Sequence, residues 1–109
     1  MERTDVETCE ISYDFILNWD RNHALMHMSR KVSMRWVAIV YRPTGVETIA
    51  RSEAFPFQWV NDPKDIEPTQ SANRAMTQLV ERLRRDDWVA TTGGKYWFNR
   101  RFRRSRDAS

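Results

Sequence analysis

Apolar and polar residues alternate along the chain from Cys9 onward, which is the pattern of a half-buried β-strand. One side of this two-residue period carries polar side chains as far as Asn18, interrupted by Ile16. The other side carries the apolar side chains of Cys9, Ile11, Tyr13, Phe15 and Leu17. Residues 1–8 have no such period and are expected to form a frayed terminus.

Two further strands are predicted to form a hairpin. Residues 32–41 are rich in β-branched and aromatic side chains, and the turn sequence Arg42-Pro43-Thr44-Gly45 follows them. Proline presets a φ angle that suits a turn, and glycine permits a positive φ. The returning segment 46–55 alternates less regularly, so we expect it to lie at a sheet edge or to contain a bulge.

One amphipathic helix is predicted over residues 69–85. Pro68 suits a helix start, and arginines in the last turn suit the negative end of the helix dipole. Residues 19–29 and 57–68 have no steady period and are expected to be connecting loops. The apolar positions of the helix recur at spacings of three and four residues, at Ala72, Met76, Leu79, Val80 and Leu83.

The last two predicted strands, 88–92 and 96–103, are separated by Gly93-Gly94, which is expected to form a tight hairpin turn. The predicted order is therefore β-β-β-α-β-β. An antiparallel sheet with one helix packed on one face buries both apolar stripes, so the fold class is α+β. We expect a single domain over residues 1–109, with residues 105–109 frayed like the other terminus.

The composition fits one globular domain, since 40% of the 109 residues are apolar and 30% are charged. Cys9 is the only cysteine, so no intrachain disulfide can form, and we expect a free thiol rather than a nucleophile. The first thirty residues contain no signal pattern, and no stretch approaches the roughly 18 apolar residues that span a bilayer. We therefore expect a cytoplasmic protein without a membrane partner.

Positive charge is concentrated toward the C-terminus. Residues 1–64 contain eight Lys/Arg against nine Asp/Glu, whereas residues 65–109 contain ten against six. Within the segment 95–106, four aromatic residues are interleaved with basic ones. Arginine neutralises phosphate and an exposed ring can stack on a base, so this segment predicts nucleic-acid binding.

A two-residue period divides the basic aromatic segment into two faces. Tyr96, Phe98 and Phe102 fall on the face that we assign to the core, together with Arg100 and Arg104. Trp97, Asn99, Arg101 and Arg103 fall on the other face, which we expect to be exposed. The predicted nucleic-acid-binding residues lie on the opposite face and among the trailing arginines: Trp97, Arg101, Arg103, Arg104 and Arg106. Two alternatives stay open, because the arginines could simply protect a terminal strand from unwanted pairing or could bind an acidic protein surface.

A second candidate surface is the aromatic run Phe55, Phe57 and Trp59, which surrounds Pro56. These rings either pack into the core or form an exposed patch that binds a protein partner or a second copy of the chain.

No motif indicates catalysis or a metal site. Asp20, His23 and His27 could bind a divalent metal from one helical face, but no HExxH glutamate follows His23 and no third ligand is indicated. Asp86-Asp87 is interpreted as a polar helix end, and Gly93-Gly94 lacks the surroundings of a phosphate-binding loop. We expect no metal, no cofactor and no enzymatic activity.

The stretch from Leu79-Val80-Glu81-Arg82-Leu83 through Asp87-Trp88 and Tyr96-Trp97-Phe98 to Arg101-Phe102-Arg103-Arg104 resembles short uncharacterised bacterial domains. The sequences of those domains contain Leu-x-x-Leu, then Gly-Trp, then a hairpin that ends in Phe-Lys/Arg-Arg. In this chain Asp87 occupies the position of their glycine. The resemblance covers about a quarter of the chain, and it implies a small α+β fold and no particular activity.

The sequence thus predicts a small non-enzymatic binding or accessory domain whose leading partner is nucleic acid. The alternative is a protein-interaction or self-assembly module that uses a sheet edge and the aromatic run.

Overall fold

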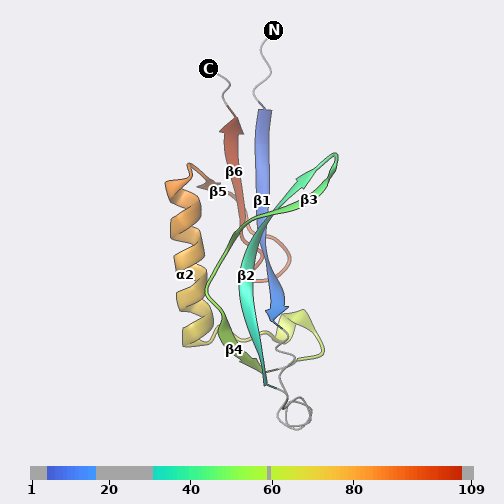
Figure 1. Cartoon of the computed structure of the whole chain (residues 1–109), viewed down its shortest axis with the longest axis vertical. Helices are drawn as coiled ribbons and strands as arrows, with labels where there is room; N and C mark the ends of the chain where they lie inside the picture. Colours follow the sequence, from blue (N-terminus) through green and yellow to red (C-terminus); the bar gives the residue numbers. More distant parts are fainter. Residues whose placement is uncertain (1–4, 17–30, 59, 107–109) are drawn as a thin grey trace.

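The computed structural model describes residues 5–16, 31–58 and 60–106 of the chain. Figure 1 shows an antiparallel sheet with one helix lying along one of its faces. The elements in chain order are β1 (Asp5–Ile16), β2 (Lys31–Arg42), β3 (Gly45–Arg51), β4 (Phe55–Gln58), a 3₁₀ turn η1 (Pro63–Asp65), α2 (Gln70–Arg85), β5 (Val89–Ala90) and β6 (Arg101–Arg106). The α+β prediction is confirmed, whereas the histidine cluster and Trp59 lie outside the described residues.

The sheet runs in the order β3-β2-β1-β6-β5, and β4 also pairs with β2. The strand nearest the N-terminus is therefore central: β1 pairs with β2 from Cys9↔Val40 onward and with β6 from Asp5↔Arg106 onward. This pairing corrects the expected frayed termini, since residues 5–8 and 105–106 belong to strands. No helix in the described ranges is long and apolar enough to cross a membrane.

The long strand β2 has two partners along its outer edge. Its second half pairs with β3, with a register shift beside Ala38 and Ile39, which agrees with the edge position and bulge expected for this segment. Its first half pairs with β4, so the loop predicted from residue 57 begins later than expected. Ser52 joins the two pairings, because its N–H donates to the Trp36 carbonyl and its hydroxyl accepts the Trp36 N–H, at 2.8 and 2.9 Å.

The core lies between α2 and one face of the sheet, with Trp36 at its centre. The Trp36 ring contacts Phe55, Trp97 and Phe98 at centroid distances of 5.2, 5.5 and 5.3 Å. Its indole N–H donates to the carbonyl of Ala72 on α2 at 2.9 Å, so the polar group of this fully buried ring is satisfied. The other fully buried large side chains are Phe98, Phe102, Ile11, Met34, Leu79, Leu83, Val40 and Cys9.

Helix α2 begins and ends close to the predicted positions, with Thr69 as its N-cap. At the C-terminus the N–H of Trp88 donates to the Leu83 carbonyl and the N–H of Asp87 donates to the Arg84 carbonyl. This double closure is the Schellman motif, in which the residue after the cap takes a left-handed conformation. Asp87 occupies that position with φ of 70°, and it is the one non-glycine residue with positive φ in the described part.

Replacing Asp87 with glycine is expected to stabilise the domain by about 1 kcal/mol, because glycine adopts the left-handed conformation without the steric cost of a Cβ. Urea unfolding followed by circular dichroism measures the change. Asp87→Ala is the control, since it also removes the carboxylate but keeps the Cβ. An equal gain in both variants would mean that the charge, and not the backbone conformation, limits stability here.

Candidate functional site

The segment between β5 and β6 is a long structured loop, residues 91–100, and not the predicted tight turn with a strand from residue 96. Neither Gly93 nor Gly94 has a positive φ, which among the glycines only Gly45 shows. The two-residue period therefore does not hold through this segment, and Asn99 is buried where an exposed side chain was expected.

Asn99 organises this loop and ties it to the central strand. Its side-chain N–H donates to the Ile11 carbonyl at 3.0 Å, and its side-chain oxygen accepts the N–H of Tyr96 at 3.2 Å. Its backbone closes a turn with Tyr96 and accepts the N–H of Gly94. Because all of these groups are paired inside the protein, the loop has one defined shape over the sheet.

Gly94 is required for the close approach of two chain segments. A Cβ at Gly94 would lie 2.8 Å from both the Cβ and the carbonyl oxygen of Asn99, whereas a Cβ at Gly93 would meet nothing within 4 Å. Since Asn99 is held by its own hydrogen bonds, it cannot move aside without breaking them.

Gly94→Ala is therefore expected to destabilise the domain by about 2 kcal/mol, as overpacking does. Gly93→Ala is the matched control and is expected to change stability by less than about 0.5 kcal/mol. Thermal unfolding of the two variants beside the unmodified protein measures the difference. Equal stability of all three proteins would show that the loop does not hold Gly94 against Asn99.

The loop and helix α2, together with residues of β5 and β6, line a pocket of about 550 Å³ that is open to solvent on one side. Four of its lining side chains are cationic, and none is a carboxylate. Two aromatic side chains, Tyr96 and Trp97, also line it. The complete lining is Val80, Arg84, Ala90, Thr91, Gly93, Gly94, Lys95, Tyr96, Trp97, Arg100, Arg101 and Phe102.

The two aromatic rings of the pocket are held from behind by the core. Trp97 is 38% exposed, packs edge-on against Phe98 at 5.7 Å, and donates its indole N–H to the Ile66 carbonyl at 2.8 Å. Tyr96 stacks on Phe98 at 5.5 Å, and the Lys95 ammonium lies 5.3 Å from the centre of the tyrosine ring. The rings are thus fixed in place while part of their surface faces the pocket.

Comparisons with protein-family models, curated proteins and solved structures found no match. Function is therefore inferred from the geometry of the described residues.

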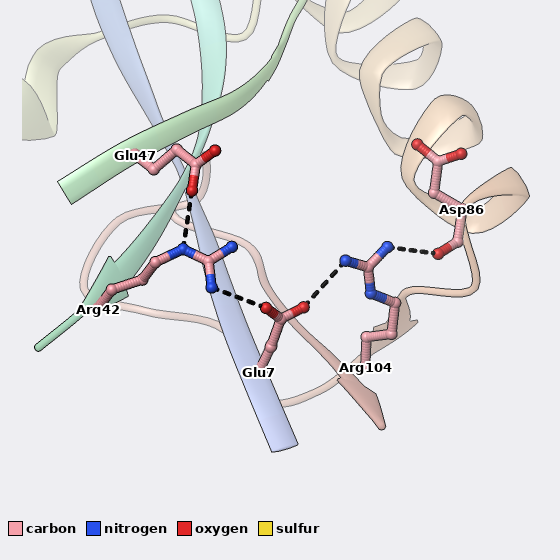
Figure 2. Close-up of polar contacts among 5 residues, drawn as sticks. All are labelled: Glu7, Arg42, Glu47, Asp86 and Arg104. Atoms are coloured by element: carbon pink, nitrogen blue, oxygen red, sulfur yellow. Dashed lines mark hydrogen bonds and ion pairs between the residues drawn. The ribbon is translucent and has the colours of Figure 1, made fainter. Parts of the chain in front are cut away.

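Arg104, predicted to contact nucleic acid, is held within a charged cluster that Figure 2 shows beside the end of α2. The Glu7 carboxylate, 8% exposed, accepts from Arg104 at 2.9 Å and from Arg42 at 3.0 Å. Arg104 also donates to the Asp86 carbonyl at 3.1 Å and lies 4.5 Å from the centre of the Trp88 ring. Arg104 therefore has a structural role, joining β1 and β6 to the end of the helix.

Arg42 completes the charged cluster from the other side. It donates to Glu47 at 2.8 Å, and its hydrogen bonds to Glu47 and Glu7 raise its pKa above the usual value of a guanidinium. Arg42 consequently stays protonated and keeps a positive charge beside Glu7.

The remaining residues of the predicted nucleic-acid site do not lie together in the structure. Arg101 lines the pocket and binds Glu10 at 2.7 Å, whereas Arg103 is exposed on the sheet face opposite α2. The side chain of Arg106 lies outside the described part. The prediction of one face shared by Trp97, Arg101 and Arg103 is therefore wrong, since Trp97 lies in the loop and only the two arginines share a strand face.

The predicted aromatic patch is not an exposed surface where the structure describes it. Phe55 lies in β4 and is buried against Trp36, so the core interpretation is the correct one for this ring. Phe57 is half-buried and packs on the core at 5.9 Å from Phe15.

Four pocket residues were missed as site residues in the sequence: Arg84, Lys95, Tyr96 and Arg100. Lys95 was placed in the basic aromatic segment but not among the binding residues, and Tyr96 and Arg100 were assigned to the core face. Arg84 lies one helical turn after Val80, which also lines the pocket, so both side chains are on the same face of α2. The helix period would therefore have identified Arg84 if the loop had been known to cross this face of the helix.

No other chemistry is indicated in the described part. Burial raises the pKa of the Cys9 thiol to about 11, so this thiol stays protonated and is a poor nucleophile near neutral pH. Within the described residues no three His, Cys, Asp or Glu side chains are grouped to hold a metal ion.

Proposed function

We propose that this chain is a non-enzymatic domain that binds single-stranded nucleic acid, with one nucleotide seated in the pocket between α2 and loop 91–100. The observation that carries the proposal is the pocket lining, which has four cationic side chains, two aromatic rings and no carboxylate. Arg84, Lys95 and Arg100 would contact phosphates, and Tyr96 and Trp97 would contact a base. Arg101 forms part of the wall, where it is bound to Glu10 at 2.7 Å.

The size and chemistry of the pocket support this ligand class. A volume of about 550 Å³ lies within the range of roughly 300 to 1,000 Å³ found for small-ligand sites. Basic side chains give affinity for phosphate without reading a sequence, and aromatic stacking adds about 1 to 3 kcal/mol per base. A single strand fits better than a duplex, because an unpaired base can leave its neighbours and enter a pocket.

The proposal is tested by fluorescence anisotropy with labelled single-stranded and duplex oligonucleotides over a series of salt concentrations. We expect the single strand to bind more tightly, with an affinity that falls as salt rises. Arg84→Ser/Arg100→Ser is expected to weaken binding at least about tenfold. It is also expected to lower the salt slope for a single strand by about 1.4, since each lost phosphate contact removes about 0.7.

The matched control is Arg82→Ser/Arg85→Ser, which removes the same charge from exposed positions of α2 that do not line the pocket. This control is expected to bind nearly as well as the unmodified protein. Equal losses in both double variants would indicate diffuse attraction, and no salt-dependent binding at micromolar protein would rule out the proposed function. Competition by free mononucleotides would show whether the pocket prefers a small ligand to a strand.

A cytoplasmic location agrees with this function and stays a prediction from the sequence.

A further inference from the structure

One end of the sheet face opposite α2 carries exposed apolar side chains. We call this end the open-face patch, and it consists of Val6, Thr8, Tyr41, Val46, Val89 and Arg103. Its residues follow from the strand pairing, because paired residues point to the same side of a sheet and neighbours along a strand point to opposite sides. Cys9 and Val40 are a buried pair facing the helix, so Thr8 and Tyr41 next to them face away from it. The pairs Tyr41↔Val46, Thr8↔Arg103 and Val89↔Arg103 extend this row from β3 to β5, and Val6 follows two residues before Thr8 on β1.

The large apolar side chains of the open-face patch are highly exposed to solvent. Val6, Tyr41, Val46 and Val89 are between 56% and 66% exposed. In the described part, the one other large apolar side chain with high exposure is Trp97, which belongs to the pocket. Farther along β2 on the same face, Val37 is only 4% exposed, so the exposure is confined to one end of the face. Exposed apolar side chains gathered at one end of a sheet face are a feature of interaction sites.

Arg103 is the one charged side chain in the row of paired residues that forms the open-face patch. It lies in the row between Thr8 and Val89, and within the described part its side chain makes no hydrogen bond or ion pair. Its strand neighbour Arg101 differs, because Glu10 neutralises it at 2.7 Å. Tyrosine and arginine are among the residue types that contribute most to binding energy at protein interfaces, and the patch presents Tyr41 and Arg103 among valines.

We propose that the open-face patch docks a protein partner that presents one carboxylate among apolar side chains. The carboxylate is required because covering Arg103 without an opposite charge would leave a buried unpaired cation. A second copy docked face to face about a twofold axis would instead bring two Arg103 side chains into one apolar interface. A nucleic acid is disfavoured because the valines offer phosphate no hydrogen bond.

This docking surface is independent of the proposed nucleic-acid site, because none of its residues lines the pocket. The probe is a set of labelled peptides with a central Glu flanked by alternating Val and Leu, beside otherwise identical peptides with central Gln or Lys. The full chain is expected to bind the Glu peptide at least about tenfold more tightly than the Gln peptide, which corresponds to about 1.4 kcal/mol.

The decisive variant is Arg103→Glu, which is expected to reverse the preference from the Glu peptide to the Lys peptide. Arg51→Glu is the matched control, since Arg51 is exposed on the same face but pairs with Val37 outside the patch, and it is expected to keep the preference for Glu. Tyr41→Ser is expected to weaken binding of every peptide. Circular dichroism establishes that each variant is folded.

Three results would overturn the proposal. The first is equal binding of the Glu and Gln peptides by the unmodified protein. The second is a concentration-dependent mass in light scattering that Tyr41→Ser abolishes, because the occupant would then be a second copy. The third is a loss of oligonucleotide affinity in Arg103→Glu as large as that in the pocket variant, because the face would then belong to the nucleic-acid site.

Discussion

Trp36→Ala is expected to lower the free energy of unfolding by about 4 kcal/mol, the cost of removing a large buried ring and leaving a cavity. Trp36 is fully buried and contacts rings from β4 and from loop 91–100, and its indole N–H holds α2 through the Ala72 carbonyl. Removing the ring therefore removes contacts to β4, to loop 91–100 and to α2 at the same time. Because small domains have a total stability of about 5 to 15 kcal/mol, the variant is expected to be only marginally folded.

Urea unfolding measured by far-ultraviolet circular dichroism determines this loss. Trp36→Phe is the control, because phenylalanine keeps an aromatic ring in the same place but cannot donate to Ala72. Its expected cost is about half as large, since it loses the hydrogen bond and part of the ring. A loss below about 1 kcal/mol for Trp36→Ala would contradict the placement of this ring at the centre of the core.

Glu7→Gln is expected to lower the free energy of unfolding by about 2 kcal/mol. Glu7 is nearly buried and accepts from Arg42 and Arg104, whose side chains are 29% and 33% exposed. The amide of glutamine keeps one acceptor oxygen but removes the negative charge that the two guanidiniums share, and it places an N–H₂ group where the second oxygen accepted a hydrogen bond. The expected cost is smaller than for a fully buried pair, because both arginines still reach solvent.

Glu47→Gln separates the effect of burial from the effect of charge. Glu47 also binds Arg42, at 2.8 Å, but it is 57% exposed. Its replacement is expected to cost less than about 0.5 kcal/mol, as is usual for a surface ion pair. Equal unfolding midpoints for the Glu7 and Glu47 variants would show that Glu7, which contacts both arginines in Figure 2, contributes no more to stability than a surface ion pair does.

The elements with a local cause were predicted well from the sequence. The prediction of helix α2 was wrong by only one residue, at its start. It succeeded because the apolar period and the Thr69 cap, which together define the helix, both lie within the segment itself. The first hairpin was also predicted, and Gly45 has a φ of 137° in its turn. The alternation from Cys9 correctly identified the buried face of β1.

The basic aromatic segment shows where local reasoning fails. Glycine is used in proteins both for positive φ and for close approach, and a Gly-Gly pair in a sequence does not distinguish the two. Gly94 serves close approach to Asn99, whose hydrogen bonds reach β1. The two-residue period of a strand was therefore wrongly assumed for residues 96–100, which belong to a loop.

The sequence by itself determined helix α2, the first hairpin, the buried face of β1 and the concentration of positive charge at the C-terminus, because each depends on spacing along the chain. Only the tertiary structure decided which arginines are available. Arg104 meets Glu7 across 97 positions of sequence, Arg101 meets Glu10 across 91, and Arg84 and Arg100 are left to line a pocket. The physical reason is that a charge is neutralised by its neighbours in space, and those neighbours follow from the strand order β3-β2-β1-β6-β5, which no local pattern encodes.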